Sequence, residues 1–121
     1  MDIHAILVQL STEEYCYFTT TGRVSGKPHE IEIWFGAEGR TLYLLSGIHK
    51  SDWVQNLRKD PAVTVRVADH TFSGIARVVT DKKEELGARY LLAEKYQQWE
   101  EGKILSQWAQ TALPVAIDVS P

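Results

Sequence analysis

Short strand-like runs, most of them separated by turn-forming residues, are the feature that most constrains how this chain can fold. Aromatic and β-branched residues dominate positions 15–21, and valine alternates with polar residues over positions 63–67. Both patterns are typical of strands in an antiparallel sheet. The expected strands are residues 15–21, 28–35, 41–46, 63–67, 71–79 and 114–119. The apolar run within 41–46 predicts a strand buried on both faces.

Helical patterns are fewer and lie between or outside these strands. Apolar residues recur at helical spacing over residues 3–10, and residues 51–60 form a short helix that Pro61 stops. Residues 81–96 are charged and periodic, which predicts a surface helix. A further short helix is expected within residues 102–112.

Glycine positions locate the turns and one tight contact. Residues 22–27 contain two glycines and are expected to form a loop, and residues 36–39 are expected to form a hairpin. Gly74 lies inside the expected strand 71–79, which predicts either a β-bulge or the close approach of another backbone.

The number and order of these elements predict a small antiparallel β-barrel. Five or six mostly sequential strands need a way to remove the exposed edges of a sheet, and closure of the sheet does so. A β-sandwich is the alternative fold. The helix between the third and fourth strands and the long helix before the last strand favour the barrel.

Composition limits the class of protein. The chain has 121 residues, 44% of them hydrophobic, which predicts one domain over residues 1–121. A net charge of -3 argues against unspecific binding of nucleic acid or of an anionic membrane. No apolar run approaches the roughly 20 residues of a membrane-spanning helix, and no secretory signal is visible, so a cytoplasmic protein is expected. Cys16 is the only cysteine and is expected to be buried, without a disulfide or zinc site.

Two basic segments carry the main functional signal, TTTGRVSGKP at residues 19–28 and SGIHKSDW at residues 46–53. Arg23 and Lys27 flank Gly26, so two cations and several backbone N–H groups can converge on an anion. Lys50 and Ser51 precede a predicted helix whose N-terminus also favours a phosphate. Together the two segments can hold one phosphate from two sides, although neither has the pattern of a nucleotide P-loop.

Other roles for these residues stay open. Arg23 and Lys27 can be solvated hairpin charges. Ser51 can be only the N-cap of the helix, a role it has whether or not a ligand binds, and we expect it both to cap the helix and to contact the phosphate. Asp52 competes with an anion for the positive end of the helix. No catalytic triad, carboxylate pair or metal spacing is visible. Glu30 and Glu32 are most simply polar surface, and the alternative is that they line a pocket beside Trp34.

These motifs, in their order, resemble the deazaflavin (F420)-dependent nitroreductase family within the FMN-binding split β-barrel superfamily, which includes relatives of pyridoxamine 5'-phosphate oxidase. The resemblance rests on TTTGRVSGKP, EIWF, LYLLSG, HKSDWVQNLRKDPAVTV and RVADHTFSGIARVVT, and weakly on PVAIDV. It covers most of the chain. It implies a mainly β fold, a six-stranded antiparallel split β-barrel with flanking α-helices.

The resemblance also assigns candidate residues for binding the phosphate and ring of a flavin-type cofactor. The expected set is Arg23, Ser25 and Lys27 in the first loop, Ser46, Gly47, His49, Lys50 and Ser51 in the second, and Trp53 and Asn56 on the helix behind it. No catalytic residue is assigned and no metal is expected, because the cofactor performs the chemistry.

The implied activity is hydride transfer from coenzyme F420 to a small electrophile such as a quinone or nitro compound. FMN is the alternative cofactor, because members of the deazaflavin branch often carry a second basic residue after TGR where this chain has Val24. A flavin- or tetrapyrrole-binding protein without turnover is another alternative, since Trp34, Phe35 and Trp53 suit a flat ring. A homodimer that buries Trp99 and Trp108 is also expected from the resemblance.

Overall fold

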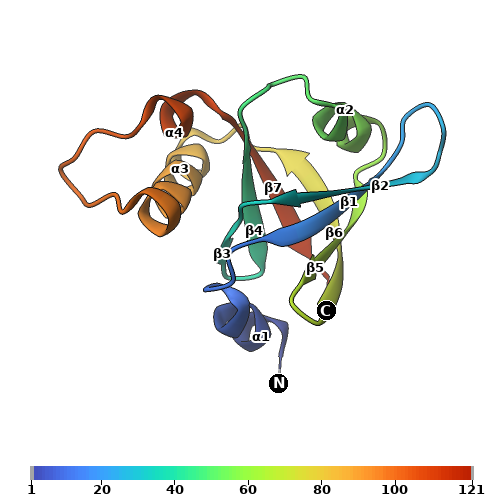
Figure 1. Ribbon diagram of the computed structural model, residues 1–121, viewed down its shortest axis with the longest axis horizontal. Helices are drawn as coiled ribbons and strands as arrows, with labels where there is room; N and C mark the ends of the chain where they lie inside the picture. The colour runs from blue at the N-terminus through green and yellow to red at the C-terminus, as the bar shows by residue number, and fades with distance from the viewer. Residues whose placement is uncertain (1, 121) are drawn as a thin grey trace.

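Residues 2–120 are described by a computed structural model and form one curled antiparallel sheet with four helices around it (Figure 1). In chain order the elements are α1 (Ile3–Leu10), β1 (Cys16–Thr21), β2 (Pro28–Ile33), β3 (Gly36–Glu38), β4 (Thr41–Ser46), α2 (Asp52–Lys59), β5 (Ala62–Val67), β6 (His70–Val78), α3 (Lys82–Gln97), α4 (Gln107–Thr111) and β7 (Leu113–Val119). No helix within these residues is both long and apolar enough to cross a lipid bilayer.

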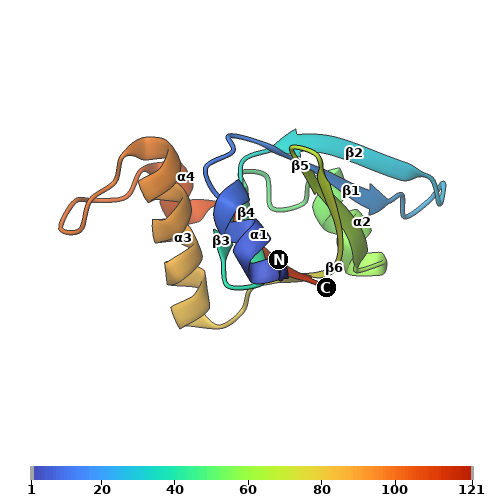
Figure 2. The ribbon, with the colours of Figure 1, turned by 90° about the horizontal axis from the view of Figure 1, so that it is seen from below.

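The strands follow the order β2-β1-β5-β6-β7-β4-β3, and every neighbouring pair is antiparallel. The sheet curls strongly, and α2 lies on the opposite side of it from α3 and α4 (Figure 2). This is the split-barrel fold with flanking helices that the sequence predicts, and the β-sandwich alternative is wrong.

The core fills the concave side of the curled sheet. Alternating residues of the strands point inward, including Phe18, Val65 and Ile117, which are fully buried. Helix α1 adds Ile3 and Leu7 to the same core. The expected buried cysteine, Cys16, belongs to this cluster.

Strand β4 is buried on both faces, as its apolar run predicts. Leu42 and Leu44 lie in the main core. On the other face, Leu45 packs with Leu92 of α3 in a second cluster that Trp108 of α4 also joins. The helices α3 and α4 therefore cover the outer face of β4 and hold it between two apolar layers.

The prediction of six strands is wrong by one, because residues 36–38 form β3 rather than part of a hairpin turn. Gly36 pairs with Tyr43 of β4, and a Cβ atom at Gly36 would lie 2.6 Å from Leu91 Cδ2 of α3. The tight contact between β3 and α3 depends on this glycine. β3 and β4 form a tight hairpin, so the short segment 36–38 is itself a strand before the turn at residues 39–40.

A network of charged and hydroxyl groups, the Arg77 clamp, joins β6, β7, β4 and α3. Arg77 donates to both carboxylate oxygens of Glu84 at 2.7 Å and to Asp118 Oδ2 at 2.7 Å. The Tyr43 hydroxyl donates to Glu84 Oε2 at 2.7 Å, and Thr41 Oγ1 donates to Asp118 Oδ1 at 3.0 Å. Hydrogen bonds from Arg77 are the main cause of the lowered pKa of Glu84 and of Asp118.

We expect Arg77→Ala to lower the free energy of unfolding at neutral pH by about 1 to 2 kcal/mol, since the clamp is partly exposed. The folded state lowers both carboxyl pKa values from their ordinary 4.5 and 3.8. The clamp therefore stabilises the fold above those values and loses its effect as pH falls through the folded ones. Urea unfolding of wild type and variant at neutral pH and at about pH 3 checks this. An unchanged difference at low pH contradicts it, and Lys103→Ala is the control.

Gly74 makes the close backbone approach that its place in a strand predicts. A Cβ atom there would lie 2.8 Å from Ile117 Cγ2 and 3.0 Å from the backbone oxygen of Asp118. We expect Gly74→Ala to lower the free energy of unfolding by about 1 to 3 kcal/mol, because the β7 backbone cannot move without disturbing its pairing.

Gly87 supplies a control of opposite sign. It lies in α3 with no atom within 4 Å of a built Cβ, so Gly87→Ala is expected to stabilise the protein by about 0.5 to 1 kcal/mol. Thermal or urea unfolding of the two variants measures both effects, and equal shifts would contradict the packing argument.

Candidate functional site

The two basic loops meet at the start of α2. Arg23, in the β1–β2 hairpin, places Nη2 3.1 Å from Asp52 Oδ1 and donates from Nη1 to Asn56 Oδ1 at 2.9 Å. Lys59 Nζ donates to the Arg23 carbonyl at 2.8 Å. Arg23 is thus held against the helix instead of standing as a solvated hairpin charge.

Asn56 is the buried anchor of this junction. Its side chain is 3% exposed, and its Oδ1 also accepts from the Arg23 backbone N–H at 3.1 Å. Its Nδ2 donates to Thr20 Oγ1 at 3.2 Å. One amide therefore connects β1, the hairpin and α2, and fixes the distance between the two loops.

The N-terminus of α2 has no side-chain cap. Ser51 occupies the N-cap position, as the sequence predicts, but its side chain makes no cap hydrogen bond. Its Oγ lies 3.2 Å from Ser46 Oγ, which also donates to the Ile48 carbonyl. By contrast, Asp2, Asp81 and Ser106 cap α1, α3 and α4 with their side chains. The first N–H groups of α2, at residues 52–54, therefore keep the capacity to bind an anion.

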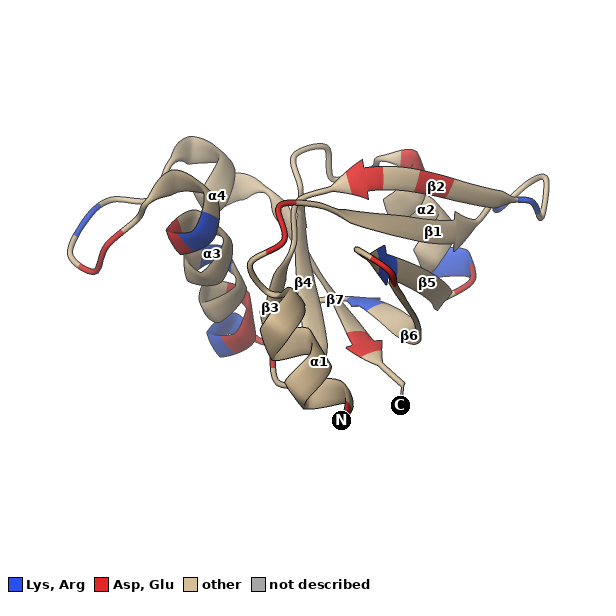
Figure 3. Cartoon of the chain, turned by 60° about the horizontal axis from the view of Figure 1, so that its bottom comes forward, with Lys and Arg blue, Asp and Glu red and all other residues tan. Residues whose placement is uncertain are grey.

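Two lysines flank this junction. Lys27 and Lys50 are exposed, and neither forms an ion pair within residues 2–120. Figure 3 shows basic positions in the β1–β2 loop and acidic ones on β2. A pocket of about 310 Å³ lies between the hairpin and α2, and its lining comprises Gly22, Arg23, Val24, Ser25, His29, Asp52 and Asn56.

The second loop also contacts α4. His49 Nε2 lies 2.6 Å from the Thr111 carbonyl. Gly47 faces Trp108, whose Cδ1 would lie 3.7 Å from a Cβ atom at position 47. His49 and Gly47 are thus placed between α2 and α4, on the side away from the hairpin.

Two of the aromatic residues considered for ring binding belong to the core. Phe35 is fully buried, and Trp53 packs edge-on against Phe18 with ring centroids 5.5 Å apart. Trp34 remains partly exposed and lines a second pocket of about 550 Å³. The residues around this pocket, which we call the tryptophan pocket, are Tyr15, Glu32, Ile33, Trp34, Leu45, Gln97 and Trp108.

The tryptophan pocket is the part of the site that the sequence predicts least well. Glu32 does line a pocket beside Trp34, as the alternative interpretation states, whereas Glu30 is not among its lining residues. Trp108 contacts Trp34 within the chain, and Trp99 stacks on Tyr90. The side chains that line the tryptophan pocket come from segments far apart in the sequence, including β2, β4 and α4. No local sequence motif therefore predicts this pocket.

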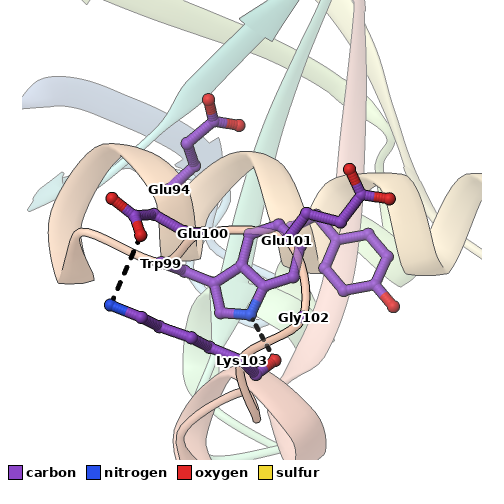
Figure 4. Close-up of a pocket in the computed structure, with 7 residues that line it drawn as sticks. Glu94, Trp99, Glu100, Glu101, Gly102 and Lys103 are labelled. Carbon is purple, nitrogen blue, oxygen red and sulfur yellow. Dashed lines mark hydrogen bonds and ion pairs between the residues drawn. The ribbon is translucent and has the colours of Figure 1, made fainter.

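A third pocket, of about 740 Å³, lies beside α3 and the following loop (Figure 4). Its carboxylates are those of Glu94, Glu100 and Glu101, and its one lysine, Lys103, pairs with Glu100 at 3.5 Å. Because negative charge dominates its lining, this pocket does not suit a phosphate.

Comparison with known proteins identifies the family of the chain. Residues 4–119 match the F420H(2)-dependent quinone reductase family. A comparison with curated proteins gives no match.

Solved structures share the fold at low sequence identity. A conserved hypothetical protein from Mycobacterium tuberculosis is 20% identical with a TM-score of 0.85, over 100% of this chain and 82% of that one. An F420-H2 dependent reductase, FDR-A, is 24% identical with a TM-score of 0.65, over 88% and 94%. A Listeria innocua protein named for pyridoxamine 5'-phosphate oxidase is 20% identical with a TM-score of 0.72, over 97% and 92%.

We expect Asn56→Ala to release the hairpin from α2. Loss of the amide leaves the buried Thr20 hydroxyl and the Arg23 N–H without their partner, which is expected to cost about 1 to 3 kcal/mol of unfolding free energy. Amide hydrogen exchange over residues 22–27 should become faster. Gln55→Ala is the control, because Gln55 bonds the Lys50 carbonyl instead of the hairpin. Unchanged exchange in Asn56→Ala would contradict the anchoring role.

Proposed function

The chain belongs to the F420H(2)-dependent quinone reductase family, whose oxidoreductases use coenzyme F420, and we propose that the junction of its two basic loops with α2 binds the phosphate of that cofactor. The observation that carries the proposal is the uncapped N-terminus of α2, against which the first basic loop is held and before which the second one ends, each loop carrying an exposed lysine. Backbone N–H groups, a helix dipole and nearby ammonium groups are a suitable set for a phosphate.

The residues fit a phosphate-bearing cofactor. The N–H groups of residues 52–54 would donate hydrogen bonds to the phosphate oxygens, and Lys27 and Lys50 would supply positive charge from the first and second loops. Arg23 is committed to Asp52 and Asn56, so its part is to orient the hairpin and offset the Asp52 charge. Ser25, Ser46 and Gly47 would shape the loops, with His49 tied to α4.

The chain's own residues position reactants instead of supplying acid–base chemistry. When bound, reduced F420 supplies a hydride and a proton, which convert a quinone to a hydroquinone, or a nitro compound to a nitroso compound and water. The curled sheet and α4 bring the tryptophan pocket next to Gly47, where an acceptor could meet the ring of the cofactor. This accounts for the lack of a catalytic triad in the sequence.

We propose that residues 1–121 form a single domain and that the protein forms a homodimer. The dimer would use the exposed edge of β2, which within residues 2–120 pairs with β1 alone. The substrate in this account is a small molecule, a quinone or a nitro compound.

We expect Lys27→Ala and Lys50→Ala each to weaken F420 binding by about threefold to tenfold, and the double variant to weaken it further. Fluorescence titration of the purified protein with F420 measures the dissociation constants, and the effect of each lysine should shrink at high salt. Lys103→Ala, a lysine in the third pocket, is the matched control. If wild type binds F420 and neither lysine substitution raises the dissociation constant at least threefold, the phosphate assignment is overturned.

Titration with FMN distinguishes between the two candidate cofactors. A preference for F420 over FMN in the same titration, with oxidation of reduced F420 on addition of a quinone, supports the proposed reductase. Binding of neither cofactor, or retention of a cofactor without turnover, would contradict it.

A further inference from the structure

Aromatic rings build the walls of the tryptophan pocket. The rings of Trp34 and Trp108 are perpendicular, at 85° and with centroids 5.6 Å apart. The other face of Trp34 is covered by Tyr96, which stacks parallel to it at 4.3 Å. The floor includes Leu45, which is 4% exposed. Two fixed aromatic walls and an apolar floor suit a flat ring.

The walls are held in place from behind. The Tyr96 hydroxyl accepts from the Phe35 N–H at 3.0 Å and lies 2.7 Å from the Glu14 carbonyl, to which it donates. Lys95 donates to the Phe35 carbonyl at 2.9 Å. These bonds fix the end of α3 to the chain between β2 and β3, so the Trp34–Tyr96 stack cannot easily close the pocket.

The pocket lies beside the proposed cofactor loops. Gly47 faces the Trp108 ring. Strand β2 runs from His29, in the hairpin pocket, to Glu32 and Ile33, in the tryptophan pocket. The second basic loop therefore connects the start of α2 with this pocket through the contact of Gly47 with Trp108.

Charge at the pocket has one sign. Glu32 is the only lining residue with a formal charge, and its Oε1 accepts a hydrogen bond from the Tyr17 hydroxyl at 2.9 Å. The carboxylates of Glu14 and Glu32 both raise the pKa of Tyr15, another lining residue. The pocket is therefore apolar with a negative rim and has no cation to receive an acidic group.

We propose that the tryptophan pocket binds the electron acceptor as a flat, uncharged ring, and that Glu32 selects against acceptors that carry a negative charge. The proposal rests on the proposed function for the reaction, but it concerns the acceptor alone. The acceptor ring would lie in the corner that the perpendicular rings of Trp34 and Trp108 form over Leu45, with Glu32 at its edge.

The test compares menadione, a neutral naphthoquinone, with naphthoquinone sulfonate. We expect Glu32→Gln to raise the ratio of kcat/KM for the sulfonate to that for menadione by about threefold to tenfold. In wild type the ratio should rise with ionic strength, and in Glu32→Gln this dependence should weaken. Glu100→Gln, a carboxylate of the third pocket, is the control. An unchanged ratio in Glu32→Gln would overturn the proposal.

Binding without the cofactor separates this proposal from the proposed function. Menadione should quench the tryptophan fluorescence of the cofactor-free protein saturably. Trp108→Leu should weaken menadione binding by more than threefold. The affinity of each variant for F420 is measured separately. If Trp108→Leu fails to fold, the acceptor ratio of Glu32→Gln still tests the proposal, because Glu32 is an exposed position on β2. Glu100→Gln should bind menadione as wild type does. A folded wild-type protein that binds F420 but binds menadione no better than Trp108→Leu does would overturn the pocket assignment while leaving the cofactor proposal in place. Failure of F420 binding alone would do the reverse.

Discussion

Burial of β4 on both of its faces is the constraint on which the rest of the structure depends. Its inward leucines, Leu42 and Leu44, complete the core of the curled sheet, while Leu45 on its outer face receives α3 and α4. A strand covered on both sides has little freedom to shift its register. The strand ends at Ser46, so the same burial fixes where the loop to α2 begins and where Trp108 meets Gly47.

The candidate site is a local positive feature in an acidic chain. Asn56, buried beneath the hairpin, sets the distance between the two loops, and Arg23 is held by Asp52 and Asn56. The charges of Lys27 and Lys50 are exposed and unpaired within residues 2–120. A hydrogen-bonded junction with exposed cations can admit a phosphate without reorganising its core, and the net charge of -3 of the whole chain limits unspecific anion binding.

The elements that sequence could predict are those with a local signal. Alternation located most strands, glycines located the β1–β2 loop, and basic residues beside a helix start indicated the two loops that meet at α2. Three features had too weak a local signal and were missed. β3 is only three residues long and pairs with β4, the Ser51 side chain lies against Ser46 without capping α2, and the tryptophan pocket brings Tyr15, Trp34, Leu45, Gln97 and Trp108 together from distant segments.

We propose that a phosphate-bearing cofactor binds the uncapped N-terminus of α2 beside the two basic loops. Backbone amide chemical shifts of the labelled protein, followed while F420 is added, test this binding mode. We expect the largest changes at residues 52–54, followed by residues 22–27 and 47–50. Saturable binding with those amides unchanged, or with the changes centred on residues 99–103 of the third pocket, would contradict it.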